Sequence, residues 1–120
     1  MAKRRIPATD GLAAVRGALA GDSTRQTIAT ATRFLLEELA ELAPGNALEV
    51  RVPPFGATQC LPGPRHTRGT PPGVVETDPA TWIALATGGL GWEDALAAAR
   101  VSASGVRADL AALLPLIRIS

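Results

Sequence analysis

Residues 78–104 of the chain read DPATWIALATGGLGWEDALAAARVSAS and contain three short predicted elements. Asp78 is a preferred helix N-cap residue, and Pro79 follows it at the first helical position, where the fixed backbone angle of proline suits a helix. Apolar residues then recur at helical spacing until Gly88 and Gly89, which are typical of a helix end. The stretch therefore opens with a short, buried helix between a cap and a glycine pair.

A second short helix and a strand are predicted to follow. The helix covers residues 92–98, and its first turn holds two carboxylates, which suit the positive end of a helix. Residues 101–104 are expected to form a short strand. A last helix is expected to open at Ser104 or Gly105 and to end before Pro115, because the residue before a proline avoids helical geometry. Residues 116–119 then form either an edge strand or an apolar tail.

The sequence upstream of this stretch predicts two helices followed by three strands. Ser23 and Gln26 make a capping-box pattern that opens the longer helix, and apolar residues continue along one of its faces. Arg33 and Glu37 lie four residues apart on its polar side. The period then changes to the alternation that is typical of a half-buried strand. The predicted elements are a helix from Thr9 or Asp10 to Gly21, a helix over 23–42, and strands over 48–52, 57–61 and 74–76.

The composition predicts a single globular domain over residues 1–120, with a short basic tail at 1–8. Hydrophobic residues make up 47% of the chain and charged residues 19%, which excludes a disordered protein. A net charge of +1 with only two tryptophans and two phenylalanines argues against nucleic-acid binding. No stretch approaches the roughly 20 apolar residues that span a bilayer, and no signal peptide stands out. We therefore expect a cytoplasmic protein without membrane insertion.

The order of elements and several motifs resemble the sterol-carrier-protein-like family. The second half of the chain resembles the family's capped helix, short helix, strand and closing apolar helix. The middle of the chain is similar to compact, stand-alone bacterial orthologues of sterol carrier proteins from actinobacteria. The resemblance covers most of residues 10–115. It rests on residues 78–88, Trp92 and residues 100–110, and on residues 50–60 and 63–72 in the middle of the chain.

The resemblance implies an α+β fold in which helices cover one face of a mixed sheet of about five strands. It also implies an apolar cavity between sheet and helices, in which family members hold fatty-acyl chains or sterols. The residues themselves leave open whether such side chains line a cavity or simply fill a core. The candidate cavity residues are Leu35, Leu39, Trp82, Leu85, Trp92, Leu96, Leu110, Leu113 and Leu114.

A polar site is expected in the loop over residues 62–73. Arg65, His66 and Arg68 lie there among prolines and glycines. Guanidinium groups bind carboxylate and phosphate well, so these residues are candidates for contact with a ligand head group or a protein partner. The alternative is a solvated loop whose arginines pair with nearby acids such as Glu76.

The sequence predicts neither catalysis nor a cofactor. One cysteine and one histidine supply two of the usual four zinc ligands, so no metal site is expected. A Cys60–His66 nucleophile pair is not favoured, because Cys60 lies in a predicted strand where burial is common. Two functions remain: a non-catalytic carrier of a lipid-like ligand, and an accessory or protein-interaction module with a filled core.

Overall fold

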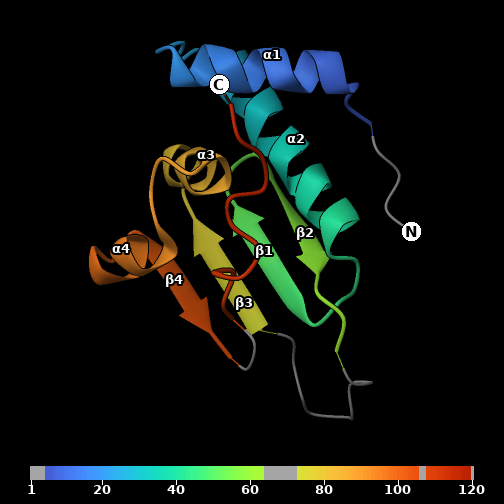
Figure 1. Ribbon diagram of the computed structural model, residues 1–120, viewed down its shortest axis with the longest axis vertical. Helices are drawn as coiled ribbons and strands as arrows, with labels where there is room; N and C mark the ends of the chain where they lie inside the picture. The colour runs from blue at the N-terminus through green and yellow to red at the C-terminus, as the bar shows by residue number, and fades with distance from the viewer. Residues whose placement is uncertain (1–4, 64–72, 106–107, 120) are drawn as a thin grey trace.

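Helices and strands follow one another in groups in the computed structural model, which describes residues 5–63, 73–105 and 108–119. Two helices come first, three strands follow, and two helices and a further strand complete the order (Figure 1). This order confirms the predicted α+β class. The helices are α1 (Ala8–Leu19), α2 (Arg25–Leu42), α3 (Pro79–Thr87) and α4 (Trp92–Ala97), and the strands are β1 (Leu48–Val52), β2 (Gly56–Cys60), β3 (Gly73–Thr77) and β4 (Val101–Ser104).

The four strands form one mixed sheet in the order β2-β1-β3-β4. β1 pairs antiparallel with β2 and parallel with β3, and β4 joins β3 antiparallel at the far edge. The number of strands in the described part of the chain is therefore close to the expected five. Residues 116–119, predicted to be either an edge strand or a tail, are a tail.

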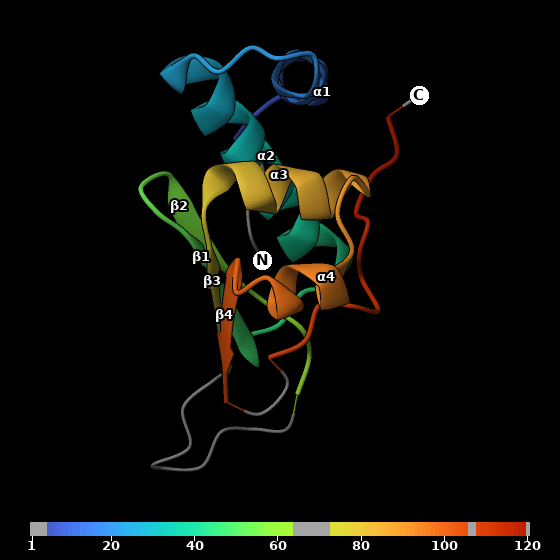
Figure 2. The same ribbon diagram turned by 90° about the vertical axis from the view of Figure 1, so that its left-hand side faces the viewer.

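Helices cover one face of this sheet and leave the other open, as Figure 2 shows for α2, α3 and α4. The strands alternate accordingly: Val50 and Val75 are buried, whereas the neighbouring Arg51 and Glu76 are exposed. On the open face Arg51 forms an ion pair with Glu49 at 2.7 Å. The apolar core thus lies between the sheet and the helices, as the resemblance implies.

The start of α2 differs from the prediction by two residues. Thr24 is the N-cap, and its hydroxyl accepts a hydrogen bond from the Thr27 amide at 3.4 Å. The carboxylate of Asp22 accepts from the Thr24 amide at 2.9 Å and from the Thr27 hydroxyl at 2.8 Å. The predicted capping box of Ser23 with Gln26 is wrong, because Thr24 and Asp22 together satisfy this end of the helix.

The predicted last helix is also wrong within the described residues. Residues 108–119 contain turns and extended backbone instead of a helix. The carboxylate of Asp109 accepts a hydrogen bond from the Ala111 amide at 2.7 Å. Local hydrogen bonds of this kind compete with those of a helix. Leu110 is fully buried in the core, so the backbone around it follows the surface of the helices.

Helix α1 packs across α2 through a glycine. A Cβ atom at Gly11 would overlap the ring of Phe34, which is itself 1% exposed. The ring therefore lies directly against the α1 backbone, and no larger residue fits at this position. Gly17, on the same helix, has only ordinary contacts around its Cβ position, the nearest being Thr27 at 3.5 Å.

We predict opposite effects for alanine at these two glycines. Gly11→Ala should lower the free energy of unfolding by about 1–3 kcal/mol, because the added methyl group overpacks the Phe34 contact. Gly17→Ala should raise it by up to about 1 kcal/mol through helix propensity alone. Urea denaturation followed by circular dichroism measures both. Equal stabilisation by the two changes would show that Phe34 does not pack against Gly11.

Candidate functional site

The residues predicted to line a cavity mostly meet in one apolar cluster. Leu113 and Leu114 are half-buried and pack against the cluster from the C-terminal part of the chain. Leu96 lies outside it on α4 and is 37% exposed. The members that are buried in the cluster are Leu35, Leu39, Trp82, Leu85, Trp92 and Leu110.

Trp82 is the centre of this cluster and is fully buried. Its indole N–H donates a hydrogen bond to the backbone oxygen of Thr32 at 3.2 Å, which joins α3 to α2. A buried indole needs such a partner, because an unpaired polar group away from water is costly. The hydrogen bond therefore fixes the orientation of the buried ring between α2 and α3.

A small polar network positions the helix that carries Trp82. The Asp78 carboxylate caps α3 by accepting from the Thr81 amide at 3.0 Å and from the Thr81 hydroxyl. Arg100 donates to the same hydroxyl at 3.1 Å, and its backbone oxygen accepts from Thr77 at 2.8 Å. Partial burial opposes ionisation of Asp78, but the bonds from Thr81 and the charge of Arg100 outweigh it and hold the pKa of this carboxyl below its ordinary value.

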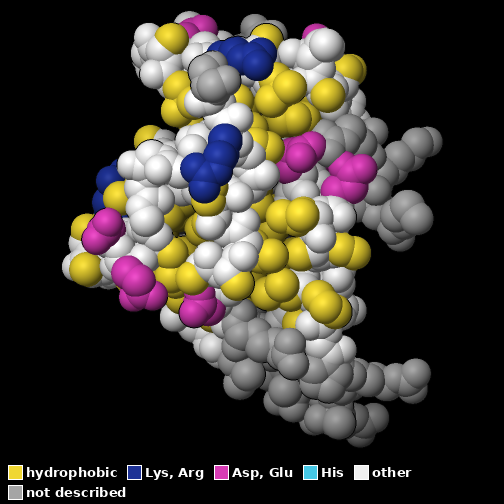
Figure 3. Space-filling view, in the orientation of Figure 1, with side chains coloured by type: hydrophobic (Ala, Val, Ile, Leu, Met, Phe, Trp, Pro, Cys, Tyr) yellow, Lys and Arg dark blue, Asp and Glu magenta, His cyan; other side chains and the backbone are white. Residues whose placement is uncertain are grey.

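A cover closes the outer side of the helix layer. We call residues 108–119 the C-terminal segment; Figure 2 shows it running along the side of the helices that faces away from the sheet. Its backbone bonds to other described elements run from the Leu116 and Ile117 amides to the Ala86 oxygen, at 2.8 and 3.2 Å. Its partly buried aliphatic side chains pack on the core, and Figure 3 shows hydrophobic side chains gathered on this face.

The predicted head-group residues Arg65, His66 and Arg68 lie outside the described residues. The structure instead brings together other arginines that sequence reasoning missed. Arg33 of α2 lies over the ring of Phe55, at 5.8 Å from its centroid, and Arg25 lies over the same ring at 5.1 Å. The sequence does contain a signal for this pair of arginines, because residues eight apart on a helix lie on the same face. It contains none for their aromatic partner, which lies on the β1–β2 turn and comes near the arginines only in the folded structure.

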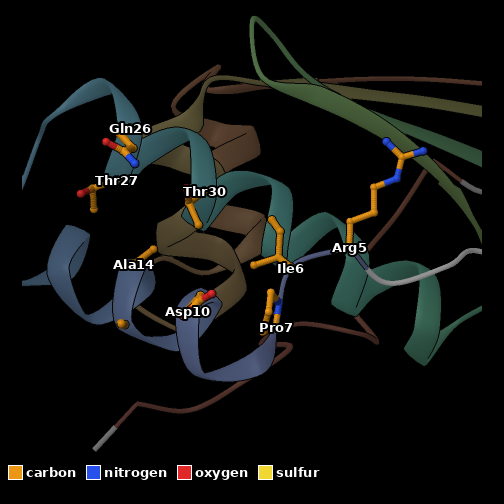
Figure 4. Close-up of a pocket in the computed structure, with 9 residues that line it drawn as sticks. Arg5, Ile6, Pro7, Asp10, Ala14, Gln26, Thr27 and Thr30 are labelled. Atoms are coloured by element: carbon orange, nitrogen blue, oxygen red, sulfur yellow. The ribbon is translucent and has the colours of Figure 1, made fainter.

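Three hollows lie along the exposed face of α2, and Arg33 lines the second and third of them. One lies between α1 and α2, where Ile6 and Asp10 face Thr30 and Arg5 points away toward the hairpin (Figure 4). The second lies between the N-terminal residues, α2 and the hairpin, and the third between Arg25 and Phe55. These hollows open at the surface, and Leu36, which lines the second, also belongs to the apolar cluster that contains Trp82.

Cys60 shows no sign of reactivity. Its side chain is buried at the end of β2, and burial raises the pKa of its thiol to about 11. The thiol is therefore protonated at neutral pH, whereas a nucleophilic cysteine needs its thiolate. The described residues hold no cluster of three metal-ligating side chains. Among them there is also no helix that is long and apolar enough to cross a membrane.

A mixed sheet with helices on one face and an apolar layer between them defines the class of domain, and comparison with known families agrees. The family model described as "Bacterial SCP ortholog", where SCP stands for sterol carrier protein, matches residues 24–116. The chain therefore belongs to this sterol-carrier-protein-like family, as the resemblance indicates. A comparison with curated proteins found no match.

The lowered pKa of Asp78 predicts a pH-dependent contribution to stability. A carboxyl whose pKa is lower in the folded state stabilises the fold above its unfolded pKa, and this contribution is lost as pH falls through the folded value. Asp78→Asn should keep a cap but remove this dependence, so its stability should fall less between pH 5 and pH 2, a window around the ordinary carboxyl pKa of about 4. Urea denaturation across that range measures the difference, and parallel curves would contradict the role of Asp78.

The buried thiol predicts slow modification of Cys60. In the native protein at pH 8, a thiol reagent such as Ellman's reagent should react far more slowly than it does in urea, because burial keeps the thiol protonated and inaccessible. The absorbance of the released thiolate measures the rate. Equal rates in the folded and unfolded protein would place Cys60 at the surface.

Proposed function

We propose that this protein is a non-catalytic carrier that holds one fatty-acyl or similar chain in its apolar interior. The observation that carries the proposal is the C-terminal segment, an aliphatic cover without helix or strand that lies over the core. Membership of a sterol-carrier-protein-like family supports the same function. The protonated, buried thiol of Cys60 supports a role without covalent chemistry.

The proposed site lies between the Trp82 cluster and the C-terminal segment. Leu113 and Leu114 are half-buried there. An acyl chain that displaces these two side chains from the core allows them to pack over the ligand instead. Each methylene buried in this way contributes about 0.8 kcal/mol, from which the cost of moving the segment is subtracted. Few backbone hydrogen bonds oppose this movement, because the described bonds to other elements converge on the single oxygen of Ala86.

A second function, an accessory or protein-interaction module, is favoured by the packing of the core. Trp82, Leu35 and Leu39 are fully buried, and the three hollows along α2 open at the surface. A module of this kind needs no ligand and acts through its surface. The two functions differ in one respect that is easily measured: only the carrier binds an apolar chain.

We predict that the gently purified protein carries a lipid or accepts one. Organic extraction followed by mass spectrometry should yield an acyl lipid in stoichiometric amount. If the extract is empty, a neutral methyl palmitate probe should compete with a dansyl-labelled fatty acid, read by energy transfer from the tryptophans. A neutral probe is chosen because it tests the apolar interior without any charged head group.

Two matched leucine variants locate the binding. Leu114→Ala should weaken binding of the neutral probe by several-fold to about tenfold. A tenfold loss corresponds to roughly 1.4 kcal/mol of lost apolar contact. Leu42→Ala serves as the control, because Leu42 is 58% exposed at the end of α2 and should leave binding unchanged. An empty extract together with no binding of the neutral probe would reject the carrier and favour the accessory module.

A further inference from the structure

We propose that the surface groove beside Arg33 and Phe55 binds a phosphate group, either free or at the end of an apolar molecule. The groove opens at the surface, and Trp82, Leu113 and Leu114 of the acyl site proposed above do not line it. It uses Arg5 and Ile6, which lie outside the residues that match the family model. The proposal therefore rests on the geometry of this groove and not on the carrier function.

The groove is large enough for a ligand. Its main part has a volume of about 650 Å³ and lies between the N-terminal residues, α2 and the turn between β1 and β2. A second hollow of about 510 Å³ continues past Phe55 to Arg25, and the two share Arg33 and Phe55. Small-molecule sites in proteins have volumes of about 300–1,000 Å³.

The charges around the groove favour an anion. The two hollows are lined by three guanidinium groups, those of Arg5, Arg25 and Arg33, and by the carboxylate of Glu37. Glu37 does not pair with Arg33, although the two are four residues apart. Its two oxygens accept the backbone amides of Arg5 and Ile6, each at 3.2 Å. The described residues place no carboxylate in an ion pair with any of the three arginines. The charged side chains that line the two hollows are therefore positive on balance, with three arginines against one glutamate.

Arg33 is held in a defined position before any ligand arrives. Its Nε donates a hydrogen bond of 2.8 Å to the backbone oxygen of Phe55, and its guanidinium lies over the Phe55 ring. Fixing Nε leaves the two terminal nitrogens to donate outward, which is the fork that binds two oxygens of a phosphate. Arg25 on the same ring adds a second charge, so Phe55 orders both guanidinium groups.

The walls of the groove also suit an apolar group attached to the phosphate. Leu36 and Ile6 line it beside Gly56, and a Cβ at Gly56 would lie 3.4 Å from Leu36. Because Gly56 has no side chain, it leaves room between α2 and the hairpin formed by β1 and β2. A phosphate monoester with an alkyl chain matches both parts of this surface, the guanidinium groups and the apolar wall.

The test uses inorganic phosphate and dodecyl phosphate as probes, with dodecanol as the neutral comparison. Calorimetry gives the affinities, and 15N NMR of the arginine Nε groups reports on Arg33 directly. We expect dodecyl phosphate to bind better than dodecanol, to shift the Arg33 Nε signal and to bind less tightly as salt increases. Binding of inorganic phosphate as well would indicate a site for free phosphate, and binding of dodecyl phosphate alone a site for amphiphiles.

Two arginine variants distinguish binding in the groove from nonspecific attraction between the anion and the positive charges of the protein. Arg33→Gln should lower the affinity for dodecyl phosphate by about tenfold or more, because the pair of guanidinium donors held in position is lost. Arg51→Gln removes the same charge from the open face of the sheet, where Arg51 already pairs with Glu49, and should change the affinity less than twofold. Far-ultraviolet circular dichroism confirms that both variants fold.

The proposal is overturned if neither phosphate probe binds, or if Arg33→Gln and Arg51→Gln have equal effects. It is also overturned if dodecanol shifts the Arg33 Nε signal as much as dodecyl phosphate does, because the phosphate then contributes nothing at this groove. These outcomes are independent of the neutral acyl probe, so failure here leaves the carrier function standing and failure there leaves this site standing.

Discussion

The burial of Trp82 is the constraint on which the rest of the structure depends. The helix that carries it has only nine residues, and isolated helices of that length are marginal in water. Its stability therefore comes from packing: the indole is fully buried and its N–H bonds to the Thr32 oxygen, which lies 50 residues earlier in the chain. Truncating a buried tryptophan typically costs about 3–5 kcal/mol. This single side chain ties α3 to α2 and so holds the helix layer against the sheet.

The same junction carries a cost. The hydroxyl of Thr32 is buried and has no hydrogen-bond partner among the described residues, and such a group costs about 1–3 kcal/mol. The backbone oxygen of Thr32 accepts a hydrogen bond from the Trp82 indole, so Thr32 contacts α3 through its main chain. The side chains at this junction are fully buried, so in the proposed carrier function an apolar ligand reaches them only when the C-terminal segment moves.

Local signals in the sequence predicted the parts of the fold that local chemistry decides. Asp78 and Pro79 predicted the start of α3, and the structure confirms Asp78 as its cap. The last helix was mispredicted, because Leu110 and its neighbours follow an apolar surface made by distant elements, which periodicity does not reveal. Most of the predicted cavity residues do meet in one cluster, since helical spacing places those of α2 and α3 on buried faces, whereas Leu110 is buried without a helix. The arginine groove was missed because Phe55 approaches Arg25 and Arg33 only when the hairpin packs on α2.

We infer that the C-terminal segment opens more easily than the fold as a whole and uncovers the core beneath it. Native-state hydrogen exchange tests it most directly, by comparing the Leu116 and Ile117 amides with the Trp82 indole N–H and the amides of the central strand β1. The two segment amides should exchange through local opening, at least about a hundredfold faster than the indole and β1, which should exchange only through global unfolding. Equal protection of both groups would show that the C-terminal segment is an integral part of the core and does not open by itself.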